Sequence, residues 1–170
     1  AVSWTTLDQK HLWGRNYDFD RLAEGTGMTS LPRGLKYQGV VSDEKMPAPH
    51  TAAYACAGVG ILMEPTPVLY EGMNEKGLMG GQLYYRGFAS YEKVSGPDEH
   101  SLQPPFLVYH LLAQCASVEE AVLWLQTKIK LADIPFFGTV PPLHWSFHDV
   151  SGETIVVEPD RDGLHIYRNT

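Results

Sequence analysis

A pair of apolar runs near the middle of the sequence constrains the fold more than any other feature. The runs are Val68–Met73 and Leu78–Tyr85, and the tetrapeptide N-E-K-G between them ends at Gly77. Because Gly77 can take the positive φ that a short hairpin loop requires, the pattern predicts a central β-hairpin. Gly80 and Gly81 would weaken an ordinary strand, so they predict a bulge or a close approach of another group to the backbone.

Strand-like segments lie on both sides of a predicted pair of helices. The segments that read as strands, besides the central hairpin, are residues 1–6, 11–19, 34–42, 52–59, 143–148, 154–158 and 164–167. Pro104 and Pro105 are well placed to open a helix that runs to about Cys115. Ser117 and Glu120 form a capping box at the start of a second helix, in which Glu120 is expected to reach back to the Ser117 amide. The order of strands, two helices and strands predicts an α+β layered domain.

The N-terminal region is predicted to form a second hairpin followed by a loop. Residues 1–6 and 11–19 would pair through a turn at residues 8–10. The segment Asp20–Arg33 contains Gly25, Gly27 and Pro32 and few periodic apolar residues, so it predicts a loop, which we expect at the rim of a pocket.

Charge and composition exclude several classes of function. Thirteen Lys and Arg against twenty Asp and Glu give a net charge of −7 without a basic cluster, so nucleic acid is not an expected partner. The longest nearly apolar run, Ala52–Met63, is too short to span a bilayer, so no membrane partner is expected. Cys56 and Cys115 make no disulfide framework, and neither has a second Cys or a His at metal-ligand spacing. His144 and His148 are separated by four residues, but their setting alternates like a strand and lacks the Glu of a helical metalloprotease motif. We expect one domain, residues 1–170, a small-molecule partner and no cofactor or metal.

Four motifs in order along the chain resemble the choloylglycine hydrolase family, which contains penicillin V acylases and conjugated bile-salt hydrolases. They are W-G-R-N-Y-D-F, P-V-L-Y-E-G-M-N-E-K-G-L-M-G-G-Q-L-Y-Y, Q-C-A-S-V-E-E-A and P-L-H-W-S-F-H-D-V-S-G-E-T-I-V-V-E-P. The resemblance implies an N-terminal nucleophile hydrolase fold, a four-layer αββα sandwich with two antiparallel sheets, of which this chain would form the N-terminal part. It also implies cleavage of a linear amide by an N-terminal Cys, through a thioester, without a cofactor.

The resemblance assigns roles in catalysis to Arg15 and Asp18. A Cys thiolate is the nucleophile in this chemistry and its own α-amino group is the base, so a cation is needed near sulfur and a carboxylate near the amine. Arg15 and Asp18 match these roles, and a regular strand would send them to opposite faces, so we expect a distortion near Tyr17. The alternative is an exposed ion pair at a strand end.

Tyr84 matches the family residue that helps to form the oxyanion hole, with backbone amides as the other donors. Bile-salt hydrolases typically have Asn at this position and penicillin V acylases Tyr, so Tyr84 favours penicillin V as substrate. Strand alternation allows only one of Tyr84 and Tyr85 to face the site. The resemblance also implies an acyl-group pocket, although each residue assigned to it could be ordinary core: Tyr17, Ile61, Leu62, Phe136 and Leu143.

Two departures from the family pattern bear on function. The family's Cys would lie just upstream of Ala1, and Ser3, the substitute within the chain, has no base beside it in sequence. The family also continues with a second half beyond residue 170, so we expect either a larger protein or a second chain that completes the fold. Because members of the family are often tetramers, the resemblance also implies a homo-oligomer, and we expect it in the cytoplasm. The alternatives to a penicillin V acylase are a conjugated bile-salt hydrolase, a hydrolase of acylated lactones, and a non-catalytic module that binds an acyl ligand or a partner.

Overall fold

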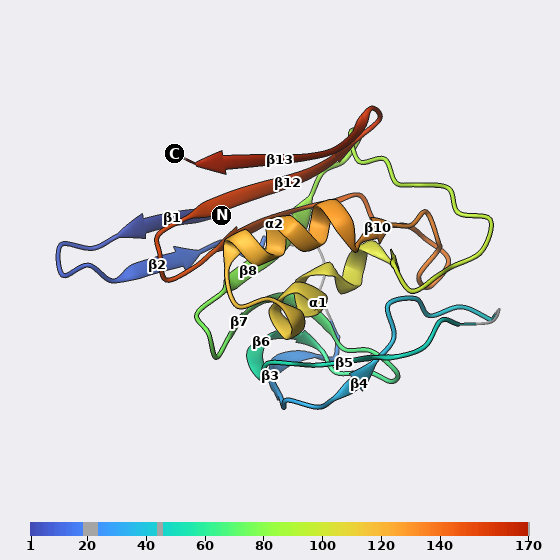
Figure 1. Cartoon of the computed structure of the whole chain (residues 1–170), viewed down its shortest axis with the longest axis horizontal. Coiled ribbons are helices and arrows are strands. Elements are labelled where there is room, and N and C mark those ends of the chain that lie inside the picture. Colours follow the sequence, from blue (N-terminus) through green and yellow to red (C-terminus); the bar gives the residue numbers. More distant parts are fainter. Residues whose placement is uncertain (19–23, 44–45, 170) are drawn as a thin grey trace.

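A seven-stranded antiparallel sheet forms the centre of the computed structural model, which describes residues 1–18, 24–43 and 46–169. Its strands lie in the order β13-β12-β11-β8-β7-β6-β3, with neighbours antiparallel throughout. The strand bounds are β3 Thr26–Leu31, β6 Cys56–Ile61, β7 Val68–Asn74, β8 Met79–Tyr84, β11 Leu143–His148, β12 Thr154–Asp160 and β13 Gly163–Asn169. The helices α1 (Leu107–Gln114) and α2 (Val118–Thr127) lie against this sheet (Figure 1).

Three small sheets complete the described elements. A hairpin pairs β1 (Val2–Thr5) with β2 (His11–Gly14), and a second antiparallel pair joins β4 (Lys36–Tyr37) to β5 (His50–Thr51). The parallel pair β9 (Ser101–Leu102) and β10 (Lys130–Leu131) lies at the two ends of the helical segment, whose first turn is the 3₁₀ helix η1 (Pro104–Phe106). Among the described residues, no helix is long and apolar enough to cross a membrane.

The predicted central hairpin is confirmed as β7 and β8. Gly77 has a φ of 87° in the turn. Asn74 holds that turn, because its Oδ1 accepts from the backbone N–H groups of Lys76 and Leu78, both at 3.0 Å. Its Nδ2 donates to the carbonyls of Leu112 and Cys115, at 2.8 and 2.7 Å. One buried side chain therefore fixes the turn and ties the hairpin to the C-terminal end of α1.

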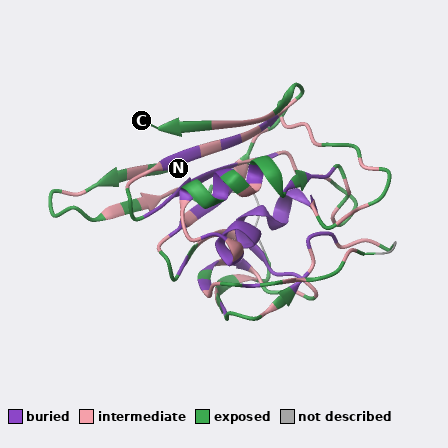
Figure 2. Cartoon of the chain, in the orientation of Figure 1, coloured by how far each residue is buried: buried purple, intermediate pink, exposed green. Residues whose placement is uncertain are grey.

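Both predicted helices are present, and their ends follow the expected chemistry with one difference. The Pro104–Pro105 pair opens the helical segment, and every residue of α1 up to Ala113 is buried. At the start of α2, Ser117 Oγ accepts from the Glu120 N–H at 3.2 Å. Glu120 reaches back to the Ala116 N–H, at 2.7 Å, rather than to the expected Ser117 amide. The buried residues concentrate in α1 and the sheet behind it (Figure 2), so the core lies between these two layers.

The N-terminal hairpin packs on the face of the sheet that the helices leave uncovered. A Cβ on Gly72 would lie 3.1 Å from Leu112 of α1, and Gly72 pairs with Gly80, so that face belongs to the helices. The next residue, Gly81, points to the opposite face. There a Cβ would lie 2.7 Å from Cη2 of Trp13, whose Nε1 donates to Ser146 Oγ at 3.3 Å. The predicted close approach at Gly80 and Gly81 is confirmed.

The layer arrangement agrees with an α+β class. The described residues supply one helical layer, one large sheet and, on the other face, the small β1–β2 sheet. They therefore account for part of the four-layer sandwich that the sequence predicts.

Four predicted boundaries are wrong. The strand expected over residues 52–59 is β6, which begins only at Cys56 and extends to Ile61. The strand expected over residues 11–19 ends at Gly14, and Phe19 lies outside the described residues. The expected strand over residues 34–42 is reduced to β4. The segment Asp20–Arg33 contains strand β3 where a loop was expected, while residues 20–23 of it lie outside the described part. Only Leu31 of β3 is fully buried, so the strand is held by its ladder with β6 and lacks a detectable apolar alternation.

Candidate active site

The candidate site is a cavity of about 720 Å³ where β7 and β8 cease to pair. The ladder between these strands ends at the pair Glu71–Gly81, although β7 begins at Val68 and β8 continues to Tyr84. Beyond that pair both strands contribute residues to the cavity wall. The further lining residues come from the segment after β2, from η1, from the ends of β6 and β11 and the chain next to them, and from the turn at residues 136–137.

Arg15 occupies the space between the two diverging strands. Its side chain is only 7% exposed, and its Nε lies 3.2 Å from Glu71 Oε2 on β7. Its Nη1 donates to the main-chain carbonyl oxygen of Gln82 on β8. Burial lowers the pKa of Arg15 and the charge of Glu71 opposes that shift, but an arginine stays cationic across the accessible pH range. A buried positive charge is thus held at one end of the cavity.

Asp18 reaches the same cavity because the chain leaves the strand conformation after Gly14. A regular strand over these residues would have sent Arg15 and Asp18 to opposite faces. The expected distortion is therefore present, and it begins earlier than the predicted position at Tyr17. Asp18 itself is exposed to solvent.

Tyr17 lines the cavity between these two residues and joins an aromatic group. Its ring stacks on Tyr70 with centroids 5.5 Å apart, and the Arg15 guanidinium lies 5.1 Å from its centroid. Burial, followed by the neighbouring Tyr70, raises the pKa of Tyr17 to about 12. Tyr17 therefore stays protonated at neutral pH and can act as a hydrogen-bond donor there.

Only the first tyrosine of the Tyr84–Tyr85 pair lines the cavity, as strand alternation predicts. Tyr84 is 44% exposed, and the Arg86 guanidinium lies 4.9 Å from its ring centroid. Tyr85 instead stacks on His144 with centroids 5.0 Å apart. Its hydroxyl donates to Glu158 and to Asp160, at 3.3 and 3.1 Å.

The predicted acyl-pocket residues lie at the cavity with one exception. Ile61, Phe136 and Leu143 form an apolar wall together with Met63, Val68 and Phe137. Phe136 is fixed by an edge-to-face contact with Phe106, with centroids 5.1 Å apart. Leu62 lies outside the cavity and is 68% exposed, because it follows Ile61 at the end of β6 and points the other way. This placement corrects the expectation that Leu62 belongs to the pocket.

Sequence reasoning missed Glu71 and Gln82. Glu71 is the only charged residue in the apolar run Val68–Met73, and a lone carboxylate in such a strand is the signal that could have identified it. Gln82 is likewise the polar residue that follows Gly80 and Gly81 in a buried strand. The family resemblance gave neither residue a role.

The other nucleophile candidates within the chain lie away from the cavity. Ser3 Oγ is hydrogen-bonded to Thr154 Oγ1 at 2.9 Å, and Ser3 does not line the cavity. Cys56 and Cys115 are buried free thiols. Burial raises the pKa of Cys56 to about 12 and raises that of Cys115 as well, so neither is a ready thiolate.

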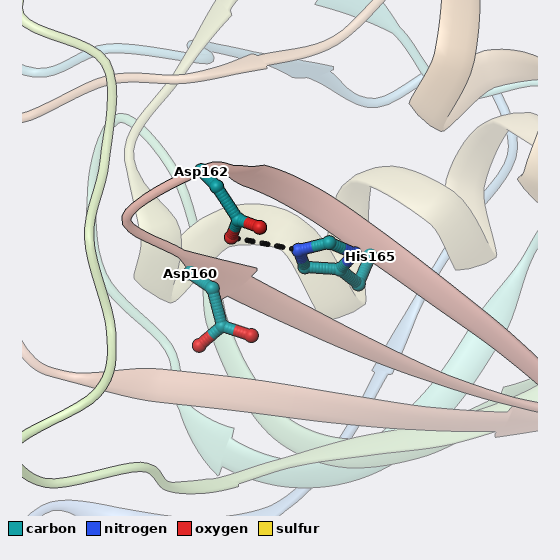
Figure 3. Close-up of side chains that lie close together, drawn as sticks. All are labelled: Asp160, Asp162 and His165. Atoms are coloured by element: carbon teal, nitrogen blue, oxygen red, sulfur yellow. Dashed lines mark hydrogen bonds and ion pairs between the residues drawn. The ribbon is translucent and has the colours of Figure 1, made fainter.

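One cluster of metal-ligand type occurs among the described residues, at the turn between β12 and β13. Ligand atoms of Asp160, Asp162 and His165 lie within 4.8 Å of one another (Figure 3). His165 Nε2 lies 2.9 Å from Asp162 Oδ1, and this hydrogen bond raises the pKa of His165. None of the three residues lines the cavity.

Comparison with known proteins identifies relatives over the whole chain. The model of the family described as linear amide C-N hydrolases, choloylglycine hydrolase family, matches residues 1–170. The chain is 30% identical to the bile salt hydrolase/transferase of Clostridium perfringens, over 99% of the chain and 50% of the relative. It is 36% identical to the protein of the same description from Lactiplantibacillus plantarum, over 97% of the chain and 49% of the relative. The chain spans about half the length of the curated relatives it matches.

Solved structures agree with these matches. A variant of the conjugated bile acid hydrolase from C. perfringens superposes with a TM-score of 0.85 at 30% identity, over 99% of this chain and 50% of that chain. A penicillin V acylase from Agrobacterium tumefaciens gives a TM-score of 0.66 at 26% identity, over 85% of this chain and 42% of that chain. The expected α+β fold of N-terminal nucleophile hydrolase type is confirmed by these likenesses.

Proposed function

Because the chain belongs to the choloylglycine hydrolase family of linear amide C-N hydrolases, we propose that its protein hydrolyses a linear amide in the cavity between β7 and β8. The acyl part of the substrate is bulky and apolar. The observation that carries this proposal is the convergence of Arg15, Asp18 and Tyr84 on one cavity whose far wall is apolar.

The proposed reaction is an acyl transfer to a cysteine and then to water. The nucleophile is the N-terminal Cys that the family motif puts just before Ala1 in the full-length protein. Its sulfur attacks the amide carbonyl carbon, and the tetrahedral oxyanion collapses to a thioester as the amine leaves with a proton from the terminal ammonium. Water then attacks the thioester, releases the acid and returns a proton to the thiolate.

Each cavity residue has a physical role in this scheme. Arg15 lies in a buried position, where its charge favours a nearby thiolate over the thiol. Glu71 orients Arg15 through the 3.2 Å ion pair. Asp18 would accept a hydrogen bond from the terminal ammonium and hold it beside sulfur. Tyr84 would donate its O–H to the developing oxyanion. A preorganised donor stabilises the charge that develops in the transition state more than it stabilises the ground-state carbonyl.

Conjugated bile salts are the substrate class that the relatives favour. The curated relatives from C. perfringens and L. plantarum, which match over nearly the whole chain, are both described as bile salt hydrolase/transferase. The apolar wall of Ile61, Val68 and Leu143 suits the apolar body of a steroid acyl group.

Penicillin V is the second candidate, and one specific observation favours it. Tyr84 lines the cavity at the position where the family resemblance associates Tyr with penicillin V acylases and Asn with bile-salt hydrolases. A phenoxyacetyl group would fill less of the cavity than a steroid and could pack against the Phe136 and Phe137 rings.

The test compares both substrates on the full-length protein with its N-terminal Cys intact. Release of glycine from glycocholate and of the amine from penicillin V is measured beside a variant with that Cys replaced by Ser. We expect turnover of at least one substrate, and none from the Ser variant. Saturable binding of both without turnover by the intact protein would exclude the hydrolase and support the non-catalytic module.

A further inference from the structure

Tyr84 lies at the exposed end of a strand, where the core does not enclose its ring. β8 ends at this residue, and Tyr84 is 44% exposed although it lines the cavity. The adjacent Tyr85 is anchored from several sides, by its ring stack on His144 and by the hydrogen bonds of its hydroxyl to Glu158 and Asp160. A donor that stabilises an oxyanion has to be held in place before the reaction. Any group that restrains the Tyr84 ring therefore bears on its proposed role.

Arg86 places a cation over that ring. Its guanidinium lies 4.9 Å from the Tyr84 ring centroid, within the range of a cation–π contact. Its backbone belongs to a hydrogen-bonded turn, in which the Tyr85 carbonyl accepts from the Ala89 N–H at 3.2 Å. The Tyr85 N–H donates to the Pro142 carbonyl at 2.9 Å, which joins the turn to the neighbouring chain. The guanidinium therefore reaches the ring from a backbone that is itself held.

No carboxylate of the described chain competes for Arg86. Arg15, Arg33 and Arg168 each form an ion pair with a glutamate. Arg86 and Arg161 form none with any residue that the structure describes. Because an arginine stays charged at any accessible pH, the Arg86 guanidinium keeps its attraction for the Tyr84 ring under all conditions of assay.

An arginine also covers a second tyrosine of the cavity. Arg15 lies over Tyr17, with its guanidinium 5.1 Å from the ring centroid, and Tyr17 lines the cavity. The two remaining cation–π contacts of the described residues use lysines, over Tyr54 and Trp124, and neither ring lines the cavity. In that part of the chain, the arrangement of arginine over tyrosine is thus confined to the cavity wall.

We propose that Arg86 is a positioning residue that holds the Tyr84 ring so that its O–H points to the developing oxyanion. The inference rests on the proposed function, because it takes Tyr84 as an oxyanion donor. Arg86 then acts through Tyr84 and makes no contact with the substrate. Its removal should lower kcat rather than raise KM, because the donor is needed in the transition state.

The experiment is a double-mutant cycle on the full-length protein with its N-terminal Cys intact. Turnover of glycocholate and of penicillin V is measured in Arg86→Gln, in Tyr84→Phe and in the double variant. Tyr84→Phe removes the hydroxyl and keeps the ring. We expect Arg86→Gln to lower kcat about fivefold, equivalent to about 1 kcal/mol, and to have no further effect in the Tyr84→Phe background.

Two further variants show whether the cation itself is responsible. Arg86→Lys keeps a cation beside the ring and should retain most of the activity. Arg161→Gln is the matched control, because Arg161 is exposed, forms no ion pair in the described chain and does not line the cavity. Its kcat should equal that of the unchanged protein.

Three results would overturn the proposal. They are an unchanged kcat in Arg86→Gln, a loss of the same size in the Tyr84→Phe background, and a loss confined to KM. The last result would assign Arg86 to binding the carboxylate that both substrates carry on the amine side of the amide.

Nuclear magnetic resonance of the protein with ¹³C-labelled tyrosine rings gives a readout that needs no turnover. The Tyr84 signal, identified by its absence from Tyr84→Phe, should move towards its value in the unfolded protein in Arg86→Gln, because an unrestrained ring averages over its rotamers. It should stay in place in Arg161→Gln. If the intact protein turns over neither substrate, the proposed function has failed, and an unmoved signal in Arg86→Gln would overturn the inference separately.

Discussion

The buried histidine of α1 should make the protein lose stability in mild acid. His110 packs against β5 and α2: its ring centroid lies 4.8 Å from that of His50 on β5 and 5.5 Å from that of Trp124 on α2. Gln114 Nε2 donates to the Tyr37 hydroxyl oxygen at 3.0 Å, and that hydroxyl is hydrogen-bonded to His110 Nδ1, also at 3.0 Å. A neutral imidazole satisfies this hydrogen bond in either tautomer, so His110 needs no additional proton for it.

The size of the effect follows from the pKa of His110 in the two states. Burial, with a smaller contribution from His50, lowers the pKa of His110 from 6.5 to about 3. Below pH 6.5 the unfolded chain binds a proton at this residue while the folded protein does not, so stability falls as pH falls towards 3. Between pH 7 and pH 5 the expected loss from His110 is about 2 kcal/mol, with a slope approaching about 1.4 kcal/mol per pH unit. Burial lowers the pKa of His50 too, which adds to the loss in the same direction.

The measurement is urea unfolding of the full-length protein at pH 7, 6 and 5, followed by tryptophan fluorescence. His110→Gln should show a shallower loss of unfolding free energy on acidification than the unchanged protein, by about 2 kcal/mol over this range. His100→Gln, at a half-exposed histidine, is the control and should keep the full slope. An unaltered slope in His110→Gln, or an equal flattening in the control, would refute the reasoning.

Three further predictions concern the cavity and its support. Asp18→Asn should lower kcat on the order of 10²-fold at an unchanged unfolding midpoint, and unaltered turnover would remove Asp18 from the site. Tyr84→Asn should lower kcat/KM for penicillin V on the order of 10²-fold; an unaffected rate would exclude its hydroxyl from the oxyanion hole. Gly81→Ala would put a Cβ 2.7 Å from the Trp13 ring and displace the hairpin, so activity should fall more than stability. Gly80→Ala would put a Cβ into the core and should chiefly lower the free energy of unfolding, by about 1–3 kcal/mol. Unfolding and rate measurements on both variants test this: a larger loss of activity in Gly80→Ala and a larger loss of stability in Gly81→Ala would contradict the prediction.

The parts of the fold that could be predicted from the sequence are those with a local physical cause. Gly77 marks the central turn because few other residues accept its positive φ. Ser117 and Glu120 mark the start of α2 because the cap satisfies N–H groups that the helix cannot. Strand β3 could not be found in this way, because an edge strand with one buried residue is defined by its ladder with β6.

The cavity is formed by strands that pair although they are far apart in the sequence. The sequence alone could therefore indicate residues that line the cavity, but not the shape of the cavity. The motif resemblance supplied Arg15, Asp18 and Tyr84, and the structure brings these to one cavity. It gave no reason to select Glu71, whose position matters because it occupies the last rung of the β7–β8 ladder. The assignment of Leu62 to the pocket was wrong for a local reason, since one step along a strand reverses the direction of a side chain.

The two adjacent glycines of β8 explain how a hairpin from the N-terminus reaches the interior of the sheet. Gly80 leaves room for the Phe147 ring, whose Cδ1 would lie 2.2 Å from a Cβ, on the face that the helices cover. Gly81 leaves room for the Trp13 indole on the opposite face. The backbone at the end of the hairpin therefore lies close enough for Arg15, two residues later, to enter the gap between β7 and β8. The residues that most weaken β8 as a strand are thus the ones that allow a buried cation to be placed at the cavity.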